Sequence, residues 1–335
     1  MMTFLLYILS LFPLALFVIF LLWMDTFSLT KGKRFALSII NGAITCIIVL
    51  SIATWVFHES KNYELFIAPI LDEILKGSII LYLVVKRKVI LVGDATIYGA
   101  SIGAGFGICE NIFFLTFTES GVYPSQAIFY GFEAAVMHIG CTTTLAMMLA
   151  MIVQGRFGVR RINKICATAI AFALATLIHF IHSIGVIPPL LLTILLVIYF
   201  FVSKWSLFKK NERAIHEWID NCINNDIALL SAIRNGKLTS THAGQYLLSL
   251  KNSFSPEIFF DICCFISEYL ELSIAAKSNL ILKEAGLPIV KKEDSTERVA
   301  ELYALKKRIG IKGMVAIQPI VKMKEVDEWA TQEMI

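Results

Sequence analysis

Charged residues are scarce in this sequence of 335 residues. Asp, Glu, Lys and Arg make up 17% of the chain and hydrophobic residues 57%, whereas about a quarter of a soluble domain is charged. This scarcity excludes an ordinary soluble protein and indicates a membrane protein that contacts the lipid bilayer. The net charge is only +4, and the basic residues gather in loops between apolar runs, so we expect no nucleic-acid partner.

The cysteine patterns that hold many small folds together are also missing. The seven cysteines are scattered, only Cys263 and Cys264 are adjacent, and no CxxC motif occurs. The sequence therefore predicts neither a disulfide framework nor a thiolate zinc site. The first apolar run, 4–24, has no basic segment before it and is longer than the apolar core of a signal peptide. We expect it to be retained as a transmembrane helix.

About seven apolar runs are long enough, at ~20 residues each, to cross a bilayer as helices. They are 4–24, 36–57, 64–85, 94–118, 126–153, 163–185 and 187–203. The predicted fold class is all-α: a polytopic membrane helix bundle of about seven spans, followed by a helical cytoplasmic C-terminal domain. Residues 1–203 form the transmembrane domain and residues 204–335 the cytoplasmic domain.

The charges of the loops predict the orientation. Basic residues occur in every second loop and at the start of the tail: Lys31, Lys33, Arg34, Lys86, Arg87, Lys88, Arg156, Arg160, Arg161, Lys164, Lys204, Lys209 and Lys210. The loops between them hold a single lysine. Because basic loops stay in the cytoplasm, we expect a multi-pass protein of the cell membrane with its N-terminus outside.

The tail has the pattern of a small helical bundle. Apolar residues recur at helical spacing over 211–235, 239–252, 256–285 and 294–309, and Gly236, Gly286 and Gly310 follow three of these segments. We find no internal repeat and no phosphate-binding glycine loop there. The simplest interpretation is a regulatory or docking domain, which leaves room for a cytoplasmic partner.

Polar residues interrupt four of the apolar runs. A charged side chain deep in a bilayer costs ~2.5–3.5 kcal/mol, so such residues are candidates for function. The candidates are Asp72, Glu73 and Lys76 in the third run, Glu110 and Asn111 in the fourth, His138 in the fifth, and His179 and His182 in the sixth.

Their depths agree with one another. At 1.5 Å per helical residue, Glu73 lies ~14 Å, Glu110 ~12 Å and His138 ~18 Å from the outer ends of their runs. His179 and His182 lie ~5–9 Å from theirs. All four helices therefore place polar groups between the midplane and the outer surface, which favours a single site in that half of the membrane.

A stripe of small residues explains how a carboxylate is tolerated in the fourth run. Gly99, Gly103 and Gly107 follow a GxxxGxxxG pattern, whose small residues let another helix approach closely. Glu110 shares their face, so we expect its side chain to point at a neighbouring helix and not at lipid. Packing alone would explain the glycines but not the acid. A local ion pair of Lys76 with Asp72 or Glu73 would likewise explain only those charges.

Together these motifs resemble the PrsW family of intramembrane proteases, distant relatives of the CAAX prenyl protease superfamily. The family pattern is EExxK, then a Gly-rich segment ending in FxxxEN, then a histidine on each of two later spans. DEILK at 72–76 matches the first motif with Asp72 in place of Glu, and FGICEN at 106–111 matches the second. His138 with Thr142 and His179 with Ser183 match the last two. The resemblance covers about residues 60–190.

The resemblance implies an endopeptidase that hydrolyses a peptide bond of a membrane-anchored substrate, such as an anti-sigma factor, on the extracytoplasmic side. Residues 1–203 would then be the catalytic domain. Our leading hypothesis makes Glu73 the general base for a water molecule. Lys76 would balance Asp72, and Asn111 would donate to the oxyanion.

The metal remains open in this hypothesis. His138 and His179 would hold a divalent ion, with zinc expected, or would polarise the scissile carbonyl directly. Glu110 would be a third ligand or would orient a histidine, and His182 is a further candidate ligand. Because HExxH is absent, a metal-free mechanism that relies on the glutamate is the alternative.

Two functions of other classes compete with proteolysis. Intramembrane acids and histidines also build proton or cation relays, so a coupled transporter is the first; the missing internal repeat argues against it. The second is a membrane sensor without enzymatic activity, in which the polar residues fix the packing of the helices.

Overall fold

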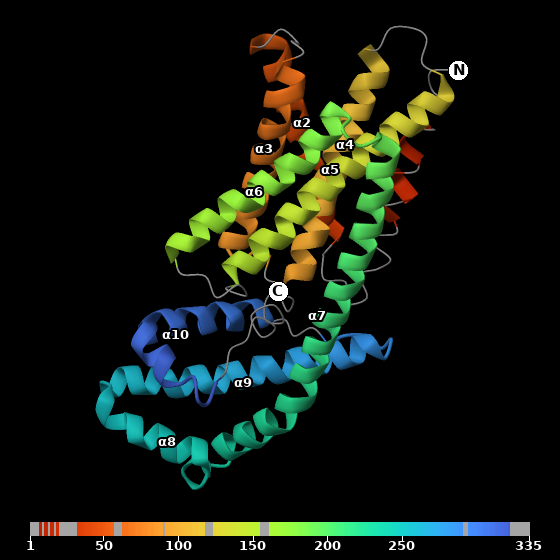
Figure 1. Cartoon of the computed structure of the whole chain (residues 1–335). Coiled ribbons are helices and arrows are strands. Elements are labelled where there is room, and N and C mark those ends of the chain that lie inside the picture. The colour runs from red at the N-terminus through yellow and green to blue at the C-terminus, as the bar shows by residue number, and fades with distance from the viewer. Residues whose placement is uncertain are drawn as a thin grey trace. The chain divides into compact units, whose positions relative to one another are not determined.

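The computed structural model describes residues 32–56, 62–89, 91–117, 123–154, 161–290 and 294–321, and parts of 7–19. Within these ranges the chain is helical and has no strand, which confirms the all-α class (Figure 1). The chain divides into two compact units, Met1–Lys209 and Lys210–Ile335. We describe each unit by itself.

The helices of the first unit follow the predicted apolar runs. They are α2 (Gly32–Val56), the π-helix η1 (Tyr63–Ile67), α3 (Ala68–Val85), α4 (Val92–Phe117), α5 (Pro124–Val153), α6 (Arg161–Ile184) and the start of α7 (Pro189–Arg234). Within the described residues, α2, α4, α5 and α6 each contain a stretch long and apolar enough to cross a membrane. The predicted total of seven spans stays a prediction, and about half of the run 4–24 lies outside the described residues.

Helix α3 differs from those four helices in its charges. Its 18 residues include Asp72, Glu73 and Lys76, and all three side chains are buried. The expected run 64–85 begins within the π-helix η1, which leads directly into α3 at Ala68. A π-helix is often found at functional sites.

We expected separate helices over 187–203 and 211–235, and this expectation is wrong. A single helix, α7, runs for 46 residues from Pro189 to Arg234. The intervening residues, 204–210, contain neither glycine nor proline, so nothing in the backbone ends the helix when the sequence changes from apolar to polar.

Glycines bring α4 into close contact with the helices on either side of it. A Cβ atom on Gly103 would lie 2.6 Å from the carbonyl oxygen of His138, and one on Gly107 would lie 2.8 Å from Cα of Ala135. On another face, a Cβ on Gly105 would meet the carbonyl oxygen of Ile39 in α2. The predicted GxxxGxxxG face thus packs against α5, which is the helix that carries His138.

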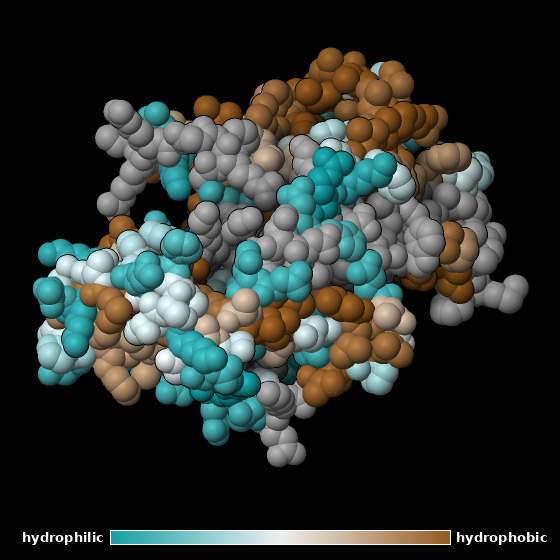
Figure 2. Space-filling view, turned by 90° about the horizontal axis from the view of Figure 1, so that it is seen from below, coloured by the Kyte–Doolittle hydropathy of each residue, from teal (hydrophilic) through white to brown (hydrophobic). Residues whose placement is uncertain are grey.

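The apolar surface of the first unit divides between core and exterior. Its largest core cluster is built from α3, α4, α5, α6 and the start of α7. Other apolar side chains point outward, among them Ile165, Ile170 and Leu177 on α6, as expected for helices that face hydrocarbon. Figure 2, seen from below, shows hydrophobic side chains gathered at the top of the view.

The second unit is a helical bundle, as its pattern predicted. Its helices are the end of α7, then α8 (His242–Leu250), α9 (Pro256–Glu284) and α10 (Ser295–Ala316), with short 3-10 helices at Leu238–Ser240 and Lys251–Ser253. Side chains of Thr241 and Ser255 cap the starts of α8 and α9. The predicted helix end at 309 is confirmed: Gly310 has a non-helical backbone with a φ of 69°, which glycine tolerates, and a second helical segment follows it to the end of α10.

Candidate metal centre

Three polar side chains of α3 share its buried face. Asp72 and Glu73 precede Lys76 by four and three residues, so all three lie within one turn. Lys76 Nζ donates to Glu73 Oε1 at 2.7 Å, and both side chains are fully buried. The predicted local ion pair therefore forms, and its carboxylate is that of Glu73; the expected balance between Lys76 and Asp72 is not what the geometry shows.

Lys76 also connects α3 to α5 and, through it, to α4. Its Nζ lies 3.0 Å from Nδ1 of His138, whose Nε2 lies 2.9 Å from Oε2 of Glu110. A protonated lysine has no acceptor, so His138 accepts at Nδ1 and carries its proton on Nε2, which donates to Glu110. The side chain of Glu110 is 32% exposed. As the glycine stripe predicted, it points at a neighbouring helix.

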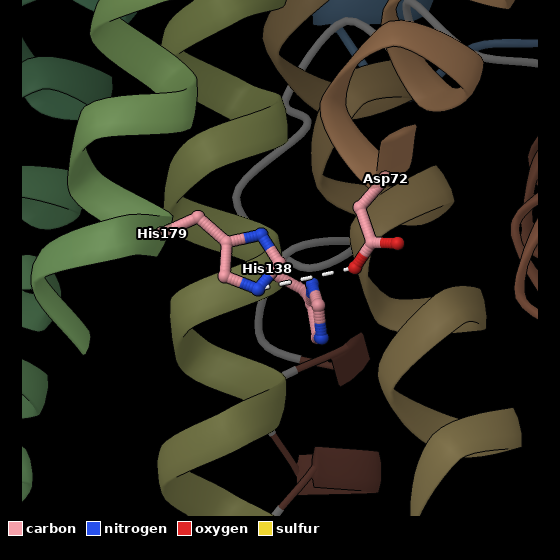
Figure 3. Close-up of side chains that lie close together, drawn as sticks. All are labelled: Asp72, His138 and His179. Atoms are coloured by element: carbon pink, nitrogen blue, oxygen red, sulfur yellow. Dashed lines mark ion pairs between the residues drawn. The ribbon is translucent and has the colours of Figure 1, made fainter. Parts of the chain in front are cut away.

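His179 brings α6 into the same cluster. Its Nδ1 lies 3.3 Å from Glu73 Oε1, and its Nε2 lies 3.9 Å from Asp72 Oδ2. In Figure 3 the imidazole of His179 points from α6 toward Asp72, with His138 between the two backbones. The rings of His138 and His179 meet edge to face, with centroids 5.0 Å apart. Four helices thus converge on one polar cluster.

The local surroundings hold the two histidines in place. Thr142 Oγ1 donates to the carbonyl oxygen of His138, and Ser183 Oγ donates to that of His179, each within its own helix. The Phe106 ring packs at a tilt against the His138 ring, with centroids 4.4 Å apart, and Lys76 Nζ lies 4.5 Å above the centre of the Phe106 ring. The sequence showed Phe106 only as part of FGICEN; the structure makes it one wall of the cluster.

Asn111 and His182 lie near the cluster but bond differently from the expectation. Asn111 is buried and its Nδ2 donates to the carbonyl oxygen of Gly131 at 2.9 Å, so in this structure the amide links α4 to α5. Nε2 of His182 is buried and has no hydrogen-bond partner, and His182 is not among the residues whose donor atoms meet.

Three donor atoms are placed where one metal ion could join them. One ligand atom from each of Asp72, His138 and His179 lies within 4.8 Å of the others. The predicted set named Glu110 and His182 beside the two histidines; the structure brings Asp72 to the histidines and leaves Glu110 bonded to His138. Two imidazoles and a carboxylate match a catalytic zinc site that keeps its fourth position open. The residues present therefore fit a divalent metal ion.

Two buried oxygen atoms without a hydrogen-bond partner also support a metal site here. Asp72 Oδ1 and Glu73 Oε2 are buried and have no hydrogen-bond partner. A buried carboxylate oxygen without a partner costs about 1–3 kcal/mol or more, so its presence calls for a ligand, a water or a proton at that point. The cluster can thus accept protons and bind a cation within helices that otherwise bury apolar side chains.

Long apolar helices with an acid–imidazole cluster between them define an integral-membrane protein with a candidate metal centre. Comparison with known families narrows this class: the sequence model of the PrsW family intramembrane metalloproteases matches residues 11–207. The chain belongs to this family, which confirms the resemblance drawn from the motifs. No curated protein and no solved structure was found that matches the chain.

Proposed function

We propose that this chain is an intramembrane endopeptidase in which Glu73 activates the attacking water beside a metal bound by Asp72, His138 and His179. The observation that carries the proposal is the free, buried Oε2 of Glu73 within the donor cluster. Membership of the protease family supports hydrolysis of a peptide bond.

Glu73 has one oxygen for orientation and one for proton transfer. Oε1 is held by Lys76 at 2.7 Å and faces His179 Nδ1 at 3.3 Å, which fixes the carboxylate on the buried face of α3. Oε2 is left to accept a proton from a water molecule. The same oxygen then delivers that proton to the nitrogen of the departing amine, as a general acid.

Asp72, His138 and His179 would hold the metal ion, which we expect to be zinc. When bound, a divalent ion of this kind acidifies water and polarises a carbonyl group. His138 has to change partners to take part. Its Nδ1 lone pair now accepts from Lys76 and its Nε2 faces Glu110, so ligation replaces one of these two hydrogen bonds.

Glu110 is proposed to orient His138. Its Oε2 accepts from Nε2 at 2.9 Å, and as the partly exposed member of the pair it lies nearest to solvent or substrate. A carboxylate behind a ligating histidine fixes the ring and raises its basicity.

The substrate and the side of cleavage rest on sequence arguments. We propose a membrane-anchored protein of the anti-sigma-factor type, cut in the outer half of the membrane. Loop charges and the depths of the polar residues support this orientation, with residues 1–203 as the catalytic domain and residues 204–335 in the cytoplasm, where they offer a surface to a partner.

The test compares cleavage products in membranes. New N-termini are mapped by mass spectrometry in cells that produce the full chain or its Glu73→Gln variant at equal levels. We expect a set of termini near the outer ends of single-span proteins that disappears in the variant. Glu133→Gln is the matched control, because Glu133 lies on α5 outside the cluster and should leave the set unchanged.

Other outcomes would select a competing function. Termini that persist in Glu73→Gln would contradict the general base. Ion flux in liposomes with no proteolysis would favour a transporter. A loss of folded protein that matches the loss of activity in both Glu73→Gln and His179→Ala would favour a packing role, as in a sensor.

A further inference from the structure

The end of α10 combines exposed apolar side chains with basic ones. Ile311 is 84% exposed and Val315 is 57% exposed, whereas Val299, Leu302, Leu305 and Ile309 of the same helix are buried. Residues 306–321 contain four basic residues and no acidic one. We define the basic end of α10 as Lys306, Lys307, Ile311, Lys312, Met314 and Val315.

The kink at Gly310 produces this arrangement. Before the kink, Leu302, Leu305 and Ile309 form a buried stripe at helical spacing. After it, Gly313 is the residue that turns inward: a Cβ there would meet the side chain of Ile309. Ile311 and Val315, two residues to either side of Gly313, are turned outward, while Met314 is partly buried against the core of this unit.

A hollow of about 890 Å³ lies against this surface. Its lining includes the apolar residues Ile311, Met314 and Val315 and the basic residues Lys306 and Lys307. Apolar walls with ammonium groups beside them suit an anionic amphiphile, whose acidic head meets the lysines while its hydrocarbon covers the apolar residues.

The ammonium groups of Lys306, Lys307 and Lys312 are available to bind an anion. Arg308 is already engaged by Asp261, with both guanidinium contacts at 2.9 and 3.0 Å. None of the three lysines forms an ion pair with another residue in the part of the chain that the structure describes. Binding to an anionic surface therefore breaks no ion pair between these lysines and the described residues.

We propose that the basic end of α10 binds the surface of an anionic membrane. Helix α7 starts with the apolar stretch Pro189–Ser203, and the second unit begins at Lys210, so the chain itself keeps this unit within reach of a bilayer. Tethering makes the contact intramolecular, which lets a weak surface bind at high effective concentration. This inference does not depend on proteolysis.

The experiment uses the full chain in nanodiscs and a lipid probe. One set of discs contains phosphatidylglycerol with a photoactivatable acyl chain, and a second contains phosphatidylcholine with the same group. After illumination, mass spectrometry locates the crosslinks. We expect crosslinks within 306–321 from phosphatidylglycerol and several-fold fewer from phosphatidylcholine. Raising the salt from about 0.1 to 1 M should reduce them, because the Debye length falls from about 10 to 3 Å.

Two variants separate charge from apolar contact. Lys306→Gln/Lys307→Gln/Lys312→Gln should weaken binding about fivefold for each lysine removed. Ile311→Ser/Val315→Ser should reduce crosslinking in both lipids. Their matched controls are Lys237→Gln/Lys251→Gln, at exposed lysines elsewhere in this unit, and Phe260→Ser, at an apolar residue that is 67% exposed on α9. Both controls should leave the crosslinks unchanged.

Each remaining result would overturn the proposal. Absence of crosslinks within 306–321 in phosphatidylglycerol discs excludes the lipid contact, as does equal yield from the triple lysine variant. Crosslinks between chains at 306–321 that rise with protein concentration would assign the surface to a second copy. Hydrogen exchange of α9 monitors folding in every variant.

Discussion

Among the described residues two lysines are fully buried, one in each unit, and their surroundings differ. Lys277 on α9 is 1% exposed and donates to Asp226 on α7 at 2.5 Å. Ser273 donates to the same carboxylate oxygen, and the Asp226 side chain is 17% exposed, so water also reaches it. This is a complete pair of the kind that fixes how two helices pack.

Lys76 in the first unit belongs to an incomplete cluster. Its partner Glu73 is fully buried and shares one oxygen between Lys76 and His179, while Glu73 Oε2 and Asp72 Oδ1 have no partner. Breaking or leaving open a buried ionic network is strongly destabilising. A chain that needed only packing would be more stable with apolar residues there, so the open cluster indicates a bound ligand or chemistry.

Replacing each lysine by methionine gives the largest expected contrast. Lys76→Met removes contacts to both Glu73 and His138, so cleavage should fall about 100-fold or more. Lys277→Met leaves Asp226 partly buried without its cation and should lower the free energy of unfolding of the second unit by about 3 kcal/mol. Denaturant titration and a cleavage assay on the same samples measure both quantities.

The control for this contrast is Lys237→Met, at an exposed lysine of the second unit, which should change neither quantity. If Lys76→Met cleaved at the normal rate, Lys76 would have no role in positioning Glu73 and His138. If Lys277→Met were as stable as the parent, the comparison of the two lysines would fail.

Glu110→Ala should have the next largest effect, because it removes the carboxylate behind His138. We expect kcat to fall about 10–100-fold while metal content is kept. Glu110→Gln should recover part of the rate, since its amide oxygen still accepts from Nε2. Loss of the metal in Glu110→Ala would instead make Glu110 a ligand.

The close packing of α4 on α5 is tested by alanine at two glycines. At Gly103 the new Cβ would lie 2.6 Å from a backbone oxygen, and at Gly140 it would lie 3.2 Å from the end of the Leu196 side chain. Since backbone cannot move aside as a side chain can, Gly103→Ala should destabilise the first unit by about 1–3 kcal/mol and Gly140→Ala by less. Equal thermal stability of the two variants would contradict this packing.

The smallest expected effect is the pH dependence of the second unit. Hydrogen bonds from Arg308 lower the pKa of Asp261, and bonds from Arg234 lower that of Glu271. A carboxylate whose pKa is lower in the folded state stabilises that state above its unfolded pKa, and the contribution is lost as the pH falls through the folded value.

Hydrogen exchange in α9 and α10 should therefore accelerate as the pH drops below about 4, after correction for the intrinsic rate. Arg308→Gln should reduce this dependence by a few-fold at most, because the pair is largely exposed. An unchanged pH profile in Arg308→Gln would show that Asp261 makes no contribution.

Much of the fold was predictable because it depends on the order and spacing of residues along the sequence. The apolar runs predicted the helices. Counting residues from the outer ends of these runs placed Glu73, Glu110 and His138 at similar depths. The glycine stripe predicted that Glu110 points at a neighbouring helix, because a row of small residues marks the face on which two helices pack closely. The continuous α7 was missed because a change of polarity was taken for a break, although no residue there disfavours a helix.

The partners within the site were harder to predict. Depth does not fix how each helix is rotated. Rotation decides that Lys76 reaches His138, that Asn111 bonds Gly131, and that Asp72 meets His179 where Glu110 was expected. These choices depend on packing among four helices at once. The sequence pattern of a single helix therefore identifies candidate site residues but not which of them bond to one another.

Metal analysis of purified chains is the most direct test of the central claim that Asp72, His138 and His179 meet at one centre. The parent and the variants Asp72→Asn, His138→Ala and His179→Ala are compared, with His216→Ala as a control in the second unit. The account predicts one divalent ion per chain in the parent and control, and loss of more than about 90% in each of the three variants. A full metal content in any of the three, or no metal in the parent, would contradict it.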